Sequence, residues 1–131
     1  MDQLVKARRV QRTELNAACP IRDVLDRIGD KWSSLILSSL KSGPLRFGAL
    51  RREIPDISQR MLTETLRNLQ RDGFLTRTVY PTTPPAVEYA LTLLGRSLCD
   101  TLGQLANWSA DNHDAIRAAR LNFDAAAVEA A

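Results

Sequence analysis

The sequence predicts a mainly α-helical fold with one small β-hairpin, arranged as a winged helix-turn-helix with flanking helices at both ends. Three observations predict this fold. Apolar residues recur at helical spacing through residues 20–72. Two of the helical segments are separated only by the stretch "PDIS", residues 55–58. Two alternating segments rich in β-branched residues, 75–80 and 87–92, then follow around the loop "PTTPPA".

The N-terminal part is expected to hold an arm or helix over residues 1–18, followed by two helices. Pro20 suits the first position of a helix and Gly29 suits its end. Asp30 suits the N-cap of the next helix, which ends before Gly43-Pro44. The apolar stripes expected to be buried are Ile21, Val24, Leu25 and Ile28 in the first of these helices, and Trp32, Leu35, Ile36 and Leu40 in the second.

The helix-turn-helix is expected over residues 46–54 and 58–72. Ser58 is a good N-cap for its second helix, and Ile57 and Leu62 stand at the two positions of a hydrophobic staple. Gly73 follows the helix, where a left-handed residue is favoured. Leucines 62, 66 and 69 share one face, and polar side chains occupy the other.

The helical period returns after Thr92, and a long helix is expected to end at about Arg117 because no breaker stops it earlier. The alanine-rich tail is expected to be either helical or frayed. The sequence therefore predicts one domain with an arm (1–18), a winged-helix core (19–92), a dimerisation helix (93–117) and a tail (118–131).

Composition narrows the class of protein. The 131 residues suit one domain, and a hydrophobic fraction of 44% is enough for a core. No apolar run approaches the ~20 residues that a membrane span needs, and no secretory signal is evident, so the expected compartment is the cytoplasm. Residues 1–80 carry 15 Lys/Arg and 9 Asp/Glu, whereas residues 81–131 carry 3 and 6. The basic excess lies in the half that holds the helix-turn-helix, which favours a polyanionic partner.

Double-stranded DNA is the expected partner, because the second helix of such a unit enters the major groove with its N-terminal residues leading. Arginine pairs with guanine and glutamine with adenine. The candidate residues for this helix are Ser58, Gln59, Arg60, Thr63 and Glu64. The β-hairpin of residues 75–92 would form the wing. The candidates for contacts with the DNA backbone are Thr82 and Thr83 at its tip, Arg77 at its base, and Arg46, Arg51, Arg52 and Lys31. The alternative is a merely solvated polar face, and Arg67 and Arg71 are expected to be solvent or salt-bridge residues.

A homodimer is expected, because one winged helix reads only a short half-site. The candidate interface residues are Leu98, Leu102, Leu105 and Trp108 of the last helix. The alternative is that they pack intramolecularly on Trp32 and Leu35.

Three stretches of the sequence resemble the HxlR-type (DUF24) winged-helix regulators, which are related to the MarR group. These stretches are "GDKWS", "RFGALRREIPDISQRMLT" and "PPAVEYALTLLGRSL", within a match from Cys19 to Leu98 that continues more weakly to Trp108. The resemblance implies a homodimeric transcription regulator of bacteria or archaea, with outer helices forming the dimer and no enzymatic activity. It fixes neither the operator, nor the regulated genes, nor the sign of regulation.

Cys19 is the candidate sensor of oxidants or electrophiles. Many members of the resembled family carry a cysteine at this place, and some sense quinones, aldehydes or oxidants through it. Independently, Cys19 precedes Pro20 and so is expected at a helix N-cap, where the helix end and the nearby Arg22 lower a thiol pKa. Cys99 is the candidate partner in an intersubunit disulfide. The alternative for Cys19 is a small buried residue without chemistry.

Other function classes find little support in the sequence. Ser38 and Lys41 have the spacing of some acyl enzymes, but the other motifs of those enzymes are missing. His113 and two distant cysteines do not make a metal site, so no metal and no cofactor is expected. A winged helix that binds protein, and a small-molecule-responsive repressor with a pocket at the dimer helices, remain alternatives. Trp32, Tyr89 and Trp108 would line that pocket or belong to the core.

Overall fold

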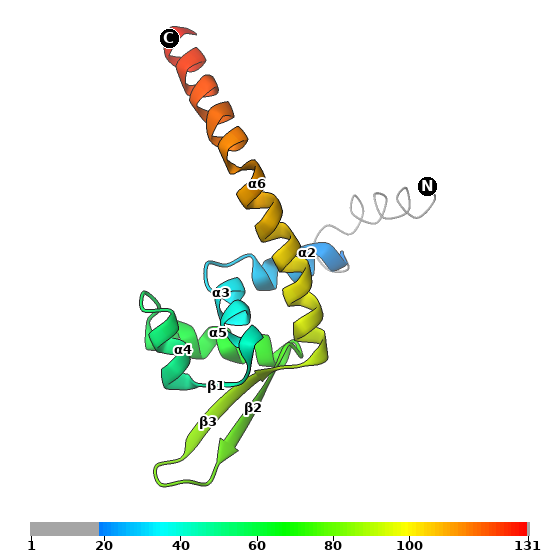
Figure 1. Cartoon of the computed structure of the whole chain (residues 1–131), viewed down its shortest axis with the longest axis vertical. Coiled ribbons are helices and arrows are strands. Elements are labelled where there is room, and N and C mark those ends of the chain that lie inside the picture. Colours follow the sequence, from blue (N-terminus) through cyan, green and yellow to red (C-terminus); the bar gives the residue numbers. More distant parts are fainter. Residues whose placement is uncertain (1–18, 131) are drawn as a thin grey trace, which may run out of the picture. The chain divides into compact units, whose positions relative to one another are not determined.

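The computed structural model of the protein describes residues 19–130, and the arm expected over residues 1–18 lies outside them. The chain divides after Cys99 into two compact units. Figure 1 shows the course of the chain. Its elements are α2 (Pro20–Ile28), α3 (Ser33–Ser39), a 3₁₀ turn η1 (Leu40–Ser42), β1 (Leu45–Arg46), α4 (Phe47–Glu53), α5 (Gln59–Arg71), β2 (Leu75–Tyr80), β3 (Ala86–Leu91) and α6 (Leu93–Ala130).

Helices α3, α4 and α5 enclose the core of the first unit. Leucine and isoleucine side chains from all three helices and from η1 meet there, and their removal from water is the main force that holds the helices together. Among residues 19–130, the leucine and isoleucine side chains at 1% exposure or less are Ile36, Leu37, Leu40, Leu50, Leu62, Leu66 and Leu69. The expected leucine face of α5 is thus confirmed as its buried face.

Local interactions define both ends of α5, as the sequence predicts. The hydroxyl of Ser58 accepts a hydrogen bond from the backbone N–H of Met61 at 3.0 Å, which satisfies one of the free N–H groups of the first turn. At the other end Gly73 has φ +84°. Its N–H donates to the carbonyl of Gln70, and the N–H of Phe74 donates to that of Leu69, so the last carbonyls of the helix have partners.

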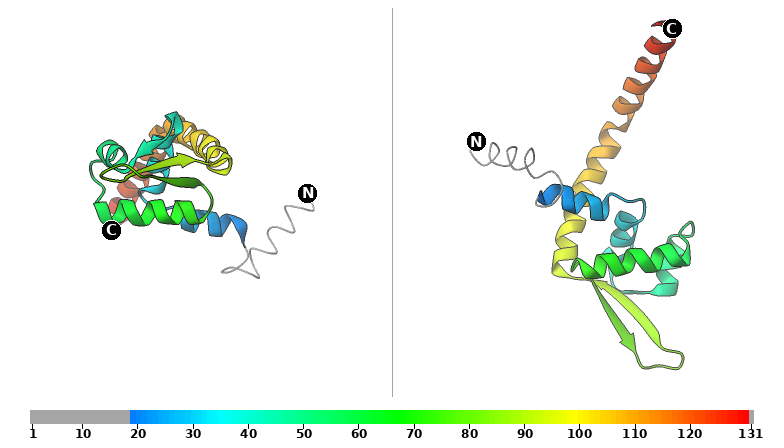
Figure 2. Two further views of the ribbon diagram at one scale, coloured as in Figure 1. Left: turned by 90° about the horizontal axis from the view of Figure 1, so that it is seen from below. Right: turned by 180° about the vertical axis from the view of Figure 1, so that it is seen from behind.

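The hairpin is part of a three-stranded antiparallel sheet with the order β1-β3-β2. The third strand, β1, was not expected, because the sequence predicts that Arg46 begins a helix. That expectation was wrong. Leu45 pairs with Tyr89 and Arg46 with Glu88, so α4 begins only at Phe47. Strand β3 covers residues 86–91 instead of 87–92. Strands β2 and β3 project together from the helices and end in the loop of residues 81–85 (Figure 2, right).

The exposure of the apolar stripe of α2 also differs from expectation. The spacing predicts a buried stripe, but Ile21, Val24 and Leu25 are 57%, 38% and 54% exposed. In α3, Leu35 is also exposed. Ile36 is buried as expected, and Leu37 is buried in place of Leu35. A helical period shows which side chains share a face, but it does not show whether anything in the same chain covers that face.

Helix α6 is longer than expected. It continues past Arg117 through the alanine-rich tail to Ala130, which selects the helical alternative for that segment. Alanine has the highest helix propensity, and neither glycine nor proline occurs between residues 104 and 130. No helix within residues 19–130 is long and apolar enough to cross a membrane.

Candidate nucleic-acid interface

The first turns of α5 present a polar face opposite the buried leucines. Gln59, Arg60, Thr63 and Glu64 are all exposed on it, as expected from the sequence. Because Leu62 and Leu66 anchor the other side at 0% and 1% exposure, this face is held outward by the core. It therefore has the orientation that contact with base edges in a major groove requires.

Two side-chain pairs order this face. Arg60 Nε donates to Glu64 Oε1 at 3.2 Å, one helical turn away. Arg51 of α4 donates through Nη1 to Oε1 of Gln59 at 3.3 Å, and so links the two helices of the helix-turn-helix. Each of these residues was expected as a DNA contact from the sequence, but their pairing was not, because the contact between residues 51 and 59 depends on the angle between the helices.

The wing carries a second cluster, on one face of the sheet. Residues directly opposite each other in a ladder share a face. The register places Arg46 opposite Glu88, and Tyr80, two positions along β2 from the residue opposite Glu88, is on the same face. The Tyr80 hydroxyl donates to Glu88 Oε1 at 3.2 Å. This hydrogen bond and the charge of Glu88 raise the pKa of Tyr80, while Arg46 lowers it by a smaller amount. Tyr80 thus remains a protonated donor at neutral pH.

The other candidates for contacts with the DNA backbone lie on different parts of the chain. Arg77 pairs with Tyr89 and so lies on the opposite face of the sheet from Arg46. Thr82 and Thr83 are exposed in the loop, where the Thr82 hydroxyl donates to the Pro84 carbonyl at 2.7 Å. The Lys31 ammonium lies 4.8 Å from the centre of the Trp32 ring.

Arg52 of α4 and Arg67 and Arg71 of α5 are also exposed. Arg67 and Arg71 line a surface hollow of about 460 Å³ together with Glu64 and Asn68.

Both cysteines are buried within the first unit. Cys19 is the N-cap residue of α2, as expected, and is 8% exposed. Cys99 is 7% exposed on α6, with its Sγ 3.6 Å from the Leu37 carbonyl oxygen. Of the aromatic residues expected in a pocket or the core, Tyr89 is a core residue, Trp32 is half-buried, and Trp108 is 56% exposed.

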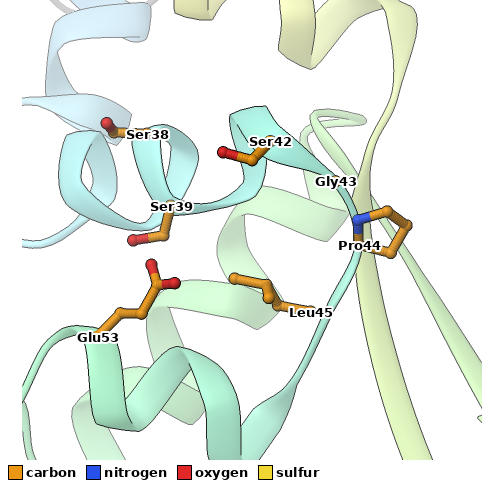
Figure 3. Close-up of a pocket in the computed structure, with 7 residues that line it drawn as sticks. All are labelled: Ser38, Ser39, Ser42, Gly43, Pro44, Leu45 and Glu53. Carbon is orange, nitrogen blue, oxygen red and sulfur yellow. The ribbon is translucent and has the colours of Figure 1, made fainter.

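A second surface hollow, of about 320 Å³, lies between η1 and α4 (Figure 3). Its lining is Ser38, Ser39, Ser42, Gly43, Pro44, Leu45 and Glu53. Glu53 points its carboxylate towards Ser39, and Lys41 is not among the lining residues, so the Ser38/Lys41 spacing does not create a paired site there. Within residues 19–130, no three His, Cys, Asp or Glu side chains gather in a way that would hold a metal ion.

A helix-turn-helix with an outward polar second helix, followed directly by a β-hairpin, defines the winged-helix class of DNA-binding transcription regulators. The family model described as HxlR-like helix-turn-helix matches residues 27–117. The chain belongs to this family of transcription regulators, as the resemblance of its motifs implies.

Known proteins support the same class. An uncharacterized HTH-type transcriptional regulator of Methanothermobacter thermautotrophicus is 49% identical over 90 residues, which is 69% of each chain. The putative transcriptional regulator ytfH from Salmonella typhimurium is 42% identical, with a TM-score of 0.71 over 81% of this chain and 95% of that chain. The redox regulator HypR in its reduced form is 41% identical, with a TM-score of 0.71 over 76% of this chain and 98% of that chain. Each of these relatives is described as a regulator.

Proposed function

We propose that the protein is a homodimeric transcription regulator that recognises a specific DNA sequence through the first turns of α5. The observation that carries this proposal is the outward face of Gln59, Arg60, Thr63 and Glu64 over a fully buried leucine stripe. The N-terminal end of α5 also offers N–H groups and a partial positive charge to a phosphate. Arg46, Arg77 and the threonines of the wing loop would contact the flanking backbone, as would Lys31.

The test is binding to the DNA upstream of the protein's own gene and of its neighbouring genes. Footprinting would locate the protected sequence, and titration at several salt concentrations would measure the electrostatic share of the binding free energy. Arg60→Ala is expected to weaken binding to that sequence by about 1–3 kcal/mol, which is roughly 5- to 150-fold. Arg120→Ala removes the same charge from the C-terminal part of α6 and is the matched control. Equal affinities for wild type and Arg60→Ala would refute the proposed binding face.

The dimer is proposed because exposed apolar side chains gather on the two outer helices. Leu105 and Trp108 of α6 are each 56% exposed, and Leu98 and Leu102 are half-buried beside them on the same stripe. Helix α2 exposes Ile21 and Leu25 as well. Burial of these surfaces between two copies would stabilise the dimer through the hydrophobic effect, and two copies would read two half-sites.

We further propose that Cys19 senses oxidants or electrophiles. The proposal is supported by its position at the N-cap of α2 and by the similarity to HypR, a redox regulator known in reduced and oxidised forms. In the oxidative route, the thiols of Cys19 and of Cys99 in the second copy lose two electrons and two protons to the oxidant and form a disulfide. Both residues are buried, so the reaction needs local opening of the packing around them.

Non-reducing electrophoresis after treatment with a mild oxidant tests this disulfide. Wild type is expected to give a dimer band that dithiothreitol removes, and Cys19→Ser and Cys99→Ser are each expected to abolish it. A dimer band that persists in either variant would exclude the proposed pairing.

A further inference from the structure

Glu64 restricts which donors of Arg60 remain available. The guanidinium has five N–H donors and no acceptor. Because Nε is held by Glu64 Oε1 at 3.2 Å, the edge formed by the two Nη atoms is left for another partner. The Arg60 side chain is 89% exposed, so this free edge faces solvent and not the protein.

Arg51 imposes a matching restriction on Gln59. An arginine only donates, so the atom of the Gln59 amide that it contacts at 3.3 Å is the oxygen. The amide NH₂ group is left on the exposed side. Pairing of glutamine with adenine needs both the oxygen, to accept from N6, and the NH₂ group, to donate to N7. Arg51 takes one of the two lone pairs of this oxygen and fixes its direction, so the amide presents its NH₂ donors more readily than its remaining acceptor position.

Guanine presents two acceptors, O6 and N7, in the major groove, whereas adenine presents one acceptor and one donor. We infer that Glu64 and Arg51 are positioning residues that set the base preference of α5, so that Arg60 and Gln59 both donate to guanines of the half-site. This inference rests on the proposed function of α5 and adds to it the kind of base that is recognised. It differs from the sequence-based expectation of adenine opposite Gln59 and of a direct base contact by Glu64.

The charge of Glu64 allows its positioning role to be distinguished from a purely structural role. An exposed ion pair one turn apart on a helix contributes little to folding. Close to DNA, the carboxylate of Glu64 is repelled by phosphates, and its loss should tighten binding to arbitrary sequences. Inside a groove with little water, however, the charge-assisted hydrogen bond from Arg60 is stronger and fixes the guanidinium in one orientation. Glu64 should therefore weaken non-specific binding while it increases discrimination between bases.

The experiment uses the full-length chain and a pool of DNA duplexes with a randomised centre, selected by binding and then sequenced. Wild type, Glu64→Gln and Arg51→Ala are compared, with Glu53→Gln as the matched control because it makes the same charge change on α4. Wild type and the control are expected to enrich the same motif, containing guanine. Glu64→Gln should lose about tenfold in discrimination at one guanine while binding an arbitrary duplex more tightly. Arg51→Ala should shift another position from guanine towards adenine. Thermal unfolding checks that each variant folds.

The outcomes distinguish this inference from the proposed function. A motif that persists unchanged in Glu64→Gln and Arg51→Ala would overturn the positioning role, and so would a wild-type motif without guanine. Equal gains in affinity for selected and arbitrary duplexes would show that Glu64 is only a repulsive charge. Failure of wild type to enrich any motif would instead overturn the proposed function itself.

Discussion

The carboxylate of Asp30 holds Ser33 at the start of α3 by two hydrogen bonds. Oδ1 accepts from the Ser33 backbone N–H at 2.7 Å, and Oδ2 accepts from its hydroxyl at 2.6 Å. Oδ1 also accepts from the backbone N–H of Trp32 at 2.7 Å. Asp30 does bind the first N–H groups at the start of α3, as its expected capping role requires, but the N-cap residue is Trp32, so Asp30 lies two positions before the expected place. The hydroxyl of Ser33, at 1% exposure, is thereby satisfied.

Asp30 should make folding dependent on pH. Partial burial raises the pKa of Asp30, but the hydrogen bonds from Ser33 and Trp32 outweigh it, so the pKa lies below 3.8. A carboxyl group with a depressed folded-state pKa contributes stability above its unfolded pKa and loses it as the pH falls through the folded value. Asp30→Asn should lower the free energy of unfolding by less than about 1 kcal/mol at neutral pH, because the neutral amide loses the charge-assisted hydrogen bonds while solvent screens this largely exposed group. This difference should shrink below about pH 4 in urea titrations. A difference independent of pH would contradict this account.

The N-cap of α5 predicts a second stability effect. Ser58→Ala removes the acceptor for the Met61 N–H and should destabilise the protein by about 1 kcal/mol in thermal or urea unfolding. Binding to DNA should also weaken, because the first turn of α5 frays. Ser58→Asp retains an acceptor at the same position and should keep near-wild-type stability. If Ser58→Ala and Ser58→Asp unfold alike, the cap does not stabilise α5.

Two glycines of α6 should respond to alanine with opposite signs. A Cβ atom at Gly95 would overlap the backbone carbonyl oxygen of Phe74, which cannot move without breaking its hydrogen bond from the Thr92 N–H. Gly95→Ala should therefore destabilise the protein by about 1–3 kcal/mol. A Cβ at Gly103 meets nothing within 4 Å, and Gly103→Ala should stabilise the helix by up to about 1 kcal/mol. Thermal unfolding of both variants at one protein concentration tests the contrast, and shifts of the same sign would refute it.

The proposed dimer interface predicts a change in mass. Leu105→Asp and Trp108→Asp place a charge on the apolar stripe and should convert the dimer to a monomer in sedimentation equilibrium, because an unpaired charge is costly to bury. Leu121→Asp is the control, since Leu121 is 70% exposed on the same helix but outside the stripe. Unchanged dimer mass in both stripe variants would exclude this surface as the interface.

Helix α5 shows how much of the site the sequence predicts. Its leucine face, its N-cap Ser58 and its terminal Gly73 are all as expected, because the spacing of the leucines and the two helix ends are set within a few residues of the chain. The side-chain contact that links it to α4 was not predicted. The Arg51–Gln59 hydrogen bond joins two helices across a turn, and no periodicity in one helix reports the orientation of the next.

The sequence by itself determined the order of helices and the hairpin, and which side chains share each helical face, because these follow from backbone propensity and side-chain period. Only the tertiary structure decided that Leu45 pairs with Tyr89 to add a third strand, and that the apolar stripe of α2 lies open in a single chain. Strand pairing and the covering of a face are contacts between distant segments. They depend on how all the elements pack, and local sequence carries no record of that arrangement.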